Sequence, residues 1–139
     1  MIENRKARYD YHIEETFTAG ISLLGTEVKS IKDGRASLVD SFCYFSENGL
    51  VIKGMSVTTA KNSFQHEPLR DRQLLLNKKE LAKLEKGLDK GYSIIPLKVF
   101  LLKGWIKVEI SIAKGKKEWD KRETIKERET QREIKQYVR

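Results

Sequence analysis

Few side chains in this sequence are suited to catalysis. His12 and His66 are the only two histidines, and Cys43 is the only cysteine. Two histidines can act as the acid–base pair of a nuclease. However, His12 fits an exposed position on a strand, and His66 fits a loop that contacts a partner. Cys43 lies in an apolar run and is expected to be a buried thiol. We predict a protein without enzymatic activity, with a nuclease as a rival hypothesis.

The sequence also lacks the spacings that hold metals and cofactors. No arrangement of His, Cys, Asp and Glu matches a zinc site, and neither a GxxxxGK[ST] phosphate loop nor a GxSxG motif occurs. We therefore expect no metal and no cofactor. The lone cysteine fits a reducing compartment. Residues 1–8 are polar and basic, and no window approaches the about 18 apolar residues of a membrane span. These features predict a cytoplasmic protein that does not associate with membranes.

Positive charge is the strongest functional signal. The chain has 139 residues, with 28 Lys and Arg against 20 Asp and Glu, which gives a net charge of +8. A basic excess favours polyanionic partners through phosphate contacts and counterion release. The alternative is a soluble protein that happens to be basic. The cations gather at loops and chain ends: Asn4 with Arg5, Lys6 and Arg8; Lys29, Lys32 and Arg35; Arg70 and Arg72; and Lys114, Lys116 and Lys117.

Alternating apolar and polar residues predict the strands that position these clusters. One strand is expected from Tyr9 to Leu23, with a bend or bulge at Ala19-Gly20. In residues 105–112 the isoleucines and Val108 alternate with polar residues, and Lys107 lies on the polar side. Asn48-Gly49 between two apolar runs predicts a hairpin.

The remaining segments complete a small domain. Residues 93–102 are a further strand, in which Pro96 should mark an edge or entry position. Residues 25–34 are expected to form a short helix capped by Thr26. Asn77 and Glu80 form a capping-box pattern for a helix over 77–90. Residues 1–8 are expected to be a loose arm and 58–73 an irregular loop. The sum is a mainly β fold, a small antiparallel barrel with short helices. Most of its aromatic residues are assigned to the core: Tyr9, Tyr11, Phe17, Tyr44 and Trp105.

The C-terminal segment is a separate unit. Residues 114–139 contain ten Lys and Arg against six Asp and Glu, with scattered apolar residues that make no continuous stripe. A helix without an apolar face has little to pack against its own barrel. We therefore expect residues 1–113 to form the folded domain and 114–139 a flexible basic tail, disordered when free and folding on an anionic partner. The alternative is a tail that only aids solubility.

Several long segments resemble the SmpB family, whose members bind transfer-messenger RNA. The matching segments cover nearly the whole chain in order: NRKARYDY (4–11), AGISLLGTEVKSIKDG (19–34), LVDSF (38–42), HEPLRDRQLLLNKKEL (66–81), GYSIIPLKVF (91–100), WIKVEISIAKGKK (105–117) and DKRETIKERE (120–129). The resemblance implies an oligonucleotide-binding (OB) type of barrel. It also implies binding to the tRNA-like part of transfer-messenger RNA and delivery of that RNA to stalled ribosomes for trans-translation.

The same resemblance implies partners and a division of labour. The tail would become helical on the ribosome and enter the decoding site and mRNA path, close to small-subunit RNA. Elongation factor Tu would associate indirectly, through the aminoacylated RNA, and the protein would be a monomer. One rival is a general binder of structured RNA or a ribosome-assembly barrel, which bulk transfer RNA would compete away.

By position, the resemblance also assigns site residues. The RNA-facing set is Asn4, Arg5, Lys6, Glu27, Leu75, Lys107, Lys114, Lys116 and Lys117. The set for the ribosomal decoding site is Trp119, Asp120, Lys121, Arg122, Lys126 and Arg128. Because a carboxylate is repelled by phosphates, Glu27 is expected to accept hydrogen bonds from a base, a ribose hydroxyl or a nearby lysine. Leu75 could equally be a core residue. Two positions depart from the family pattern: Thr18, often an acid in relatives, and Trp119, where relatives carry histidine or tyrosine.

Overall fold

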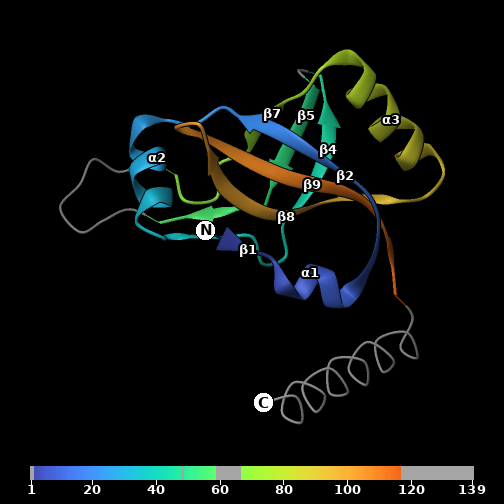
Figure 1. Ribbon diagram of the computed structural model, residues 1–139, viewed down its shortest axis with the longest axis horizontal. Helices are drawn as coiled ribbons and strands as arrows, with labels where there is room; N and C mark the ends of the chain where they lie inside the picture. Colours follow the sequence, from blue (N-terminus) through green and yellow to red (C-terminus); the bar gives the residue numbers. More distant parts are fainter. Residues whose placement is uncertain (1, 48, 59–66, 117–139) are drawn as a thin grey trace, which may run out of the picture.

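The computed structural model describes residues 2–47, 49–58 and 67–116, whose strands form an antiparallel sheet that closes on itself (Figure 1). The sheet order is β1-β8-β4-β5-β7-β2-β9, and β9 also pairs with β8; β3 and β6 form a separate two-stranded ribbon. This confirms the predicted mainly β fold. The elements are β1 (Ile2–Glu3), α1 (Arg5–Asp10), β2 (Tyr11–Ile21), α2 (Gly25–Lys32), β3 (Ala36–Ser37), β4 (Phe42–Ser46), β5 (Gly49–Lys53), β6 (Ser56–Val57), β7 (Arg72–Leu75), α3 (Lys78–Asp89), β8 (Ser93–Leu102) and β9 (Trp105–Gly115).

Strand β9 follows the predicted alternation and then continues past it. Ile106, Val108 and Ile110 are buried inside the barrel, as expected for one face of a strand. The strand does not stop at residue 112, because its partner β2 continues and pairs Tyr11 with Gly115. Lys114 therefore lies in strand β9 of the barrel, and the division between a folded domain and a tail stays a prediction.

Strand β2 contains the predicted bulge at a different place. Its register against β9 shifts between Ile13 and Glu15, whereas pairing is regular from there through Gly20. The register therefore shows no bulge at Gly20, whose small size matters on the outer face of the barrel. The strand also begins at Tyr11 rather than Tyr9, because Tyr9 lies in α1.

The prediction that Pro96 marks an edge or entry of its strand was wrong. Strand β8 is an interior strand, bordered by β9 on one side and by β4 and β1 on the other. The register of β8 against β9 shifts between Pro96 and Lys98. Proline cannot donate to a ladder, and a bulge is the interior position that tolerates it.

The hairpin and the two longer helices appear where the sequence predicts them. Ser46 pairs with Gly49 across the β4–β5 turn, and Gly49 has the positive φ, +109°, that such a turn needs. The capping box of α3 is complete: Asn77 Oδ1 accepts from the Glu80 N–H, and Glu80 Oε1 accepts from the Asn77 N–H. Helix α2 starts at Gly25, so Thr26 is not its cap. Instead the Glu27 carboxylate accepts from the Leu24 N–H at 2.8 Å.

The N-terminal residues are folded, against the expectation of a loose arm. Ile2 pairs with Val99 of β8, and Ala7 is buried in a small cluster with Leu97. Asn4 holds the start of α1 through long-range bonds, because its amide nitrogen donates to Leu38 O at 3.1 Å and to Pro96 O at 3.0 Å. Contacts of this kind connect distant parts of the chain and leave no local sequence signal. The predicted loop over 58–73 is also shorter, because β7 begins at Arg72; residues 59–66 lie outside the described part.

Helix α3 packs closely on the barrel at a glycine. A Cβ added at Gly87 would lie 3.1 Å from two side-chain carbons of Ile112 in β9, so any larger residue would require Ile112 to shift. Leu84 of the same helix is fully buried. Of the aromatic residues assigned to the core, Phe17 is buried, Tyr9, Tyr11 and Tyr44 are half-buried, and Trp105 is 72% exposed. Within the described residues, no helix is long and apolar enough to cross a membrane.

Candidate nucleic-acid interface

A fully buried ion pair lies between α2 and β7. The side chains of Glu27 and Arg72 are both 0% exposed, and Arg72 Nε donates to Glu27 Oε2 at 2.5 Å. Arg70 Nη2 donates to the other carboxylate oxygen at 2.6 Å. Burial opposes ionisation of Glu27, but the hydrogen bonds from Arg70 and the Leu24 N–H, with the charge of Arg72, hold its pKa below the ordinary value.

This burial bears on the prediction that Glu27 faces RNA. Its carboxylate has no exposed surface in this fold, so the structure shows Glu27 as part of the barrel's internal network. Its hydrogen-bond donors are two arginines and a backbone N–H, not the lysine, base or ribose that the sequence suggested. Glu27 can act on a surface only by positioning its neighbours. The arginine partners are 43 and 45 residues away, which explains why local sequence did not reveal them.

Arg72 extends the network to the chain that enters β7. Its guanidinium donates to Met55 O at 2.8 Å, to Arg70 O at 2.9 Å and to Pro68 O at 3.2 Å. Arg70 reaches Ser22 O at 3.4 Å. These bonds fix β7 and the residues before it against α2 and the end of β2. The exposed side chains of β7 are those of Gln73 and Leu75, so the network sets the position of that surface.

The outer face of the barrel carries a continuous row of residues across four strands. Leu75 of β7 pairs with Gly20 of β2, Gly20 pairs with Lys107 of β9, and Lys107 pairs with Phe100 of β8. Directly opposed residues point to the same face. Leu75 is 55% exposed, so it is not a core residue. A Cβ at Gly20 would lie 3.3 Å from Leu75 Cβ and 3.7 Å from Lys107 Nζ, so the ammonium group lies above the glycine.

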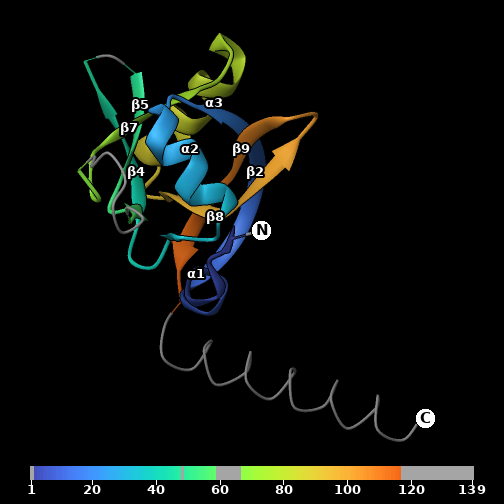
Figure 2. The ribbon, with the colours of Figure 1, turned by 90° about the vertical axis from the view of Figure 1, so that its left-hand side faces the viewer.

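Two more residues extend this row to the tip of the β8–β9 hairpin. Leu102 pairs with Trp105. Each lies two residues from the pair Phe100 and Lys107 on its own strand, so both point to the same face as that pair. Leu102 is 45% exposed. The turn between them is tight, with φ of +52° at Lys103 and +84° at Gly104. Figure 2 shows this hairpin projecting from the barrel on the side opposite β4 and β5. We call Leu75, Gly20, Lys107, Phe100, Leu102 and Trp105 the sheet-face strip.

The strip combines apolar surface with one free cation. Among the described residues Lys107 makes no ion pair, whereas the neighbouring Lys98 pairs with Glu109 at 3.3 Å and lies 5.3 Å from the centre of the Phe100 ring. Exposed aromatic rings can stack on unpaired bases, and a lysine beside them can bind phosphate. Trp105 was missed because it was assigned to the core. It shares the parity of Lys107 in β9, and this signal was present in the sequence.

The N-terminal residues of the predicted set form a second basic region around α1. Arg5 has a side chain that is 90% exposed, and Lys6 donates to Asp40 Oδ1 at 2.8 Å, a hydrogen bond that raises the pKa of Lys6. Asn4, by contrast, is 4% exposed. Its side-chain amide donates to Leu38 O and Pro96 O and accepts from the Ala7 N–H, so in this structure Asn4 holds the fold, and its predicted contact with RNA stays a prediction.

The end of β9 joins this second region. Lys114 is exposed and pairs with His12, and the Lys116 N–H donates to Asp10 O at 2.7 Å. Lys107 and Lys114 are seven residues apart on one strand, about 23 Å. The predicted RNA-facing residues are therefore divided between the strip and the α1 region. The remaining ones lie outside the described residues: Lys117, Trp119, Asp120, Lys121, Arg122, Lys126 and Arg128.

The described residues offer little for catalysis. His12 is exposed on β2 and Cys43 is buried, and burial raises the pKa of the Cys43 thiol. Within the described part of the chain, no group of three or more His, Cys, Asp and Glu is arranged to hold a metal. His66 lies outside that part, so the structure gives no distance between the two histidines of the predicted pair.

Comparisons with known proteins agree with one another. The family model described as "SmpB protein" matches residues 1–139. The chain is 44% identical over 142 residues to the SsrA-binding protein of Gloeobacter violaceus, covering 100% of this chain and 93% of the relative. It is 48% identical over 142 residues to the SsrA-binding protein of Staphylococcus epidermidis, covering 100% and 91%.

A solved structure gives the same result in three dimensions. It is described as "tmRNA-SmpB: a journey to the center of the bacterial ribosome", and one of its chains superposes with a TM-score of 0.70 at 40% identity. The match covers 84% of this chain and 85% of that one. Together with the family model that spans all 139 residues, these matches show that the chain belongs to the SmpB family.

Proposed function

We propose that the protein binds the tRNA-like domain of transfer-messenger RNA and delivers that RNA to stalled ribosomes for trans-translation. The relatives are named SsrA-binding proteins, and the related structure is one of tmRNA and SmpB in the bacterial ribosome. The observation that carries the proposal in this chain is the sheet-face strip. It places the ammonium of Lys107, which makes no ion pair with any residue that the structure describes, beside exposed aromatic and leucine side chains.

The role of the protein is binding rather than catalysis. The strip offers Lys107 for a phosphate and Trp105 for stacking on a base that has left its helix. Glu27, Arg70 and Arg72 hold β7, and thus Leu75, in place. An RNA with an exposed loop fits Lys107, Trp105 and Leu75 together, because unstacked bases and phosphates lie close to one another in such a loop.

The tail has a separate role in this proposal. Residues from 114 onward carry a net charge of +4, and beyond the barrel they would serve the small-subunit RNA at the decoding site through Trp119, Asp120, Lys121, Arg122, Lys126 and Arg128. The protein would act as a cytoplasmic monomer and meet elongation factor Tu only through the aminoacylated RNA. Deleting residues 119–139 should leave RNA binding intact and abolish tagging on stalled ribosomes. Loss of RNA binding in that truncated chain would contradict this division.

The strip is tested by anisotropy titration with fluorescently labelled transfer-messenger RNA. Lys107→Ala should weaken binding about tenfold and reduce the salt slope by about 1, as expected for one lost phosphate contact. Trp105→Ala should cost about 1–3 kcal/mol if the ring stacks on a base, and Trp105→Phe should keep most of that binding. Lys86→Ala, an exposed lysine in the last turn of α3, is the matched control.

Specificity is tested by adding bulk transfer RNA as a competitor. A protein dedicated to transfer-messenger RNA should remain bound in a large excess of competitor. Equal competition would favour the rival function, a general barrel for structured RNA. Unchanged affinity in both Lys107→Ala and Trp105→Ala would remove the strip from the interface.

A further inference from the structure

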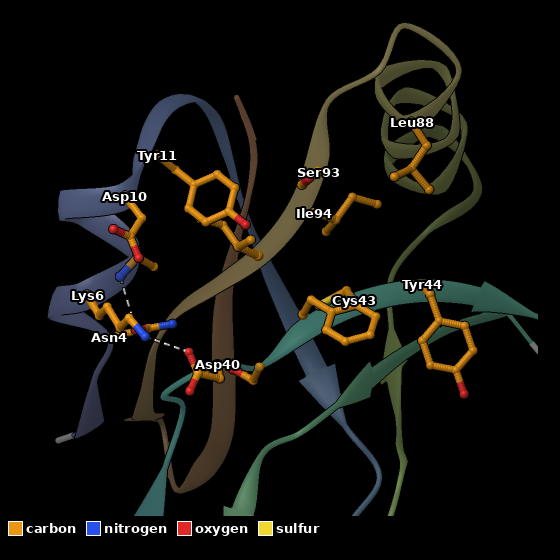
Figure 3. Close-up of a pocket in the computed structure, with 14 residues that line it drawn as sticks. Asn4, Lys6, Asp10, Tyr11, Asp40, Cys43, Tyr44, Leu88, Ser93 and Ile94 are labelled. Carbon is orange, nitrogen blue, oxygen red and sulfur yellow. Dashed lines mark hydrogen bonds and ion pairs between the residues drawn. The ribbon is translucent and has the colours of Figure 1, made fainter. Parts of the chain in front are cut away.

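A cavity of about 490 Å³ opens between α1, β4 and β8, at the end of the barrel opposite the hairpin tip (Figure 3). Ser93 and Ile94 of β8 line it, and they lie six or more residues along that strand from the nearest member of the sheet-face strip, Phe100. Leu88 of α3 lies at its far end. The size falls within the about 300–1,000 Å³ of pockets that hold small molecules. It is therefore distinct from the strip and large enough for a nucleobase.

The walls of this cavity are apolar and aromatic. Cys43 and Ile94 are buried in its floor, and Tyr11 and Phe42 contribute rings at its sides. Phe42 is 46% exposed, although a phenylalanine on a strand next to a helix would ordinarily be covered. Tyr44 turns its hydroxyl away, toward Asp71 at 2.9 Å (Figure 3). Flat apolar walls of this kind suit a planar ring.

The polar groups of the cavity are divided between the fold and the mouth. Asn4 and Ser41 use their side chains on backbone groups of the fold. Lys6 and Asp40 meet at 2.8 Å across the mouth, and this pair occupies only Oδ1 of Asp40. Among the described residues, the hydroxyls of Tyr11 and Ser93 have no hydrogen-bond partner. The cavity thus presents acceptors and small donors to whatever enters it.

From these features we propose that the cavity binds one unstacked guanine base of an RNA partner. The inference rests on the proposed function, because it assumes that RNA reaches this surface. Guanine has two adjacent donors, N1–H and the 2-amino group, and one carboxylate can accept both. Asp40 lies at the mouth with Oδ2 unused, and its Oδ1 can accept a second hydrogen bond beside the one from Lys6, since each carboxylate oxygen has two lone pairs. Asp10 lines the same cavity. Adenine and cytosine lack this pair of donors.

The charges outside the cavity fit the rest of the nucleotide. Arg5 is free to swing toward a phosphate, since its contact with Glu3 is 3.9 Å long and its side chain is 90% exposed. Lys114 is exposed nearby on β9. Two carboxylates and Lys6 at the cavity, with Arg5 and Lys114 beside it, match a base and its backbone. An acidic peptide would be repelled by the two carboxylates, and a purely apolar segment would offer them no hydrogen-bond donors.

The first experiment titrates the full-length protein with mononucleotides and follows backbone amides by NMR. GMP should shift residues 41–44 and 93–95 in a saturable way. IMP, which lacks the 2-amino group, should bind roughly tenfold more weakly, the loss expected for one hydrogen bond to a charged acceptor. Inorganic phosphate alone should shift only α1 and the end of β9. Identical shifts from GMP and phosphate, or no cavity shifts with millimolar GMP, would overturn the inference.

Asp40→Asn provides the matching variant. Asp40 has φ of +61°, a left-handed conformation that asparagine also tolerates, so the backbone should be preserved. The variant should lose the preference for GMP over IMP. Asp89→Asn, which removes the same charge from the end of α3, should keep it. A preference that survives in Asp40→Asn would contradict the role of this carboxylate.

A second arm identifies the RNA that supplies the guanine. If the base belongs to transfer-messenger RNA, Asp40→Asn and Phe42→Ala should weaken its binding several-fold. If the base belongs to the ribosome, both variants should bind that RNA normally but tag stalled products poorly. If Asp40→Asn and Phe42→Ala both bound RNA and tagged stalled products normally, the guanine site would be overturned. A loss of RNA binding in Lys107→Ala would still support the proposed function in that case.

Discussion

Replacement of Glu27 by glutamine removes the negative charge at the centre of the buried network between α2 and β7. Arg72 would remain 0% exposed and charged, without its ionic partner. Removing one member of a buried ion pair typically costs about 3–5 kcal/mol. Glutamine retains a carbonyl oxygen that can accept one bond, and Arg72 keeps three backbone acceptors. The expected loss in free energy of unfolding is therefore at the lower end, about 3 kcal/mol.

Urea denaturation followed by circular dichroism measures this loss directly. The midpoint should fall while the m-value stays constant. Glu85→Gln, at an exposed position of α3, is the control and should change stability by less than about 0.5 kcal/mol. The double variant Glu27→Gln/Arg72→Met should lose clearly less than the sum of the two single variants, because the unpaired buried charge is gone.

The same variant separates a positioning role from direct contact with RNA. If Glu27 positions Leu75 through Arg70 and Arg72, RNA affinity and stability should fall together. If Glu27→Gln lowered the free energy of unfolding by less than about 1 kcal/mol, the buried ion pair would not stabilise the fold as argued. If the variant bound RNA more weakly at unchanged stability, a positioning role for Glu27 would be refuted. The second outcome would mean that the carboxylate leaves its buried site to meet the RNA.

Three further changes test the fold. The pKa of Glu27 is lowered in the folded state, so its contribution is complete above its ordinary pKa of about 4.3 and is lost as pH falls through the lower folded value. Glu27→Gln should therefore flatten the stability profile in acid, as pH-dependent denaturation would record. Asn4→Ala removes the cap of α1 and two buried hydrogen bonds, and should cost about 2 kcal/mol in thermal unfolding. Gly54→Ala should cost more than Gly104→Ala: both have positive φ, but only at Gly54 would the new Cβ meet backbone, 3.1 Å from Asp40 O.

The elements that the sequence predicted are those with local signals. Alternation is visible within β9 itself, and the Asn77–Glu80 capping box spans four residues. Helix α1 has only six residues and is held by Asn4 bonds to residues 34 and 92 positions away. No local pattern encodes such contacts. The same holds for Glu27, which reads as a polar residue on a short helix until the fold brings Arg72 to it.

Basic residues that look alike in the sequence have different uses in the structure. Arg72 is fully buried and spends its guanidinium on Glu27 and three carbonyls, so it contributes nothing to an RNA surface. Lys107, with an ammonium that makes no ion pair among the described residues, keeps its charge for a partner. Arginine suits the buried role because its planar group donates several hydrogen bonds at once. A net charge therefore overestimates RNA-binding capacity whenever arginines build the core. In this chain, the row across β7, β2, β9 and β8 presents the ammonium of Lys107 on the outer face of the barrel, whereas the guanidinium of Arg72 is buried.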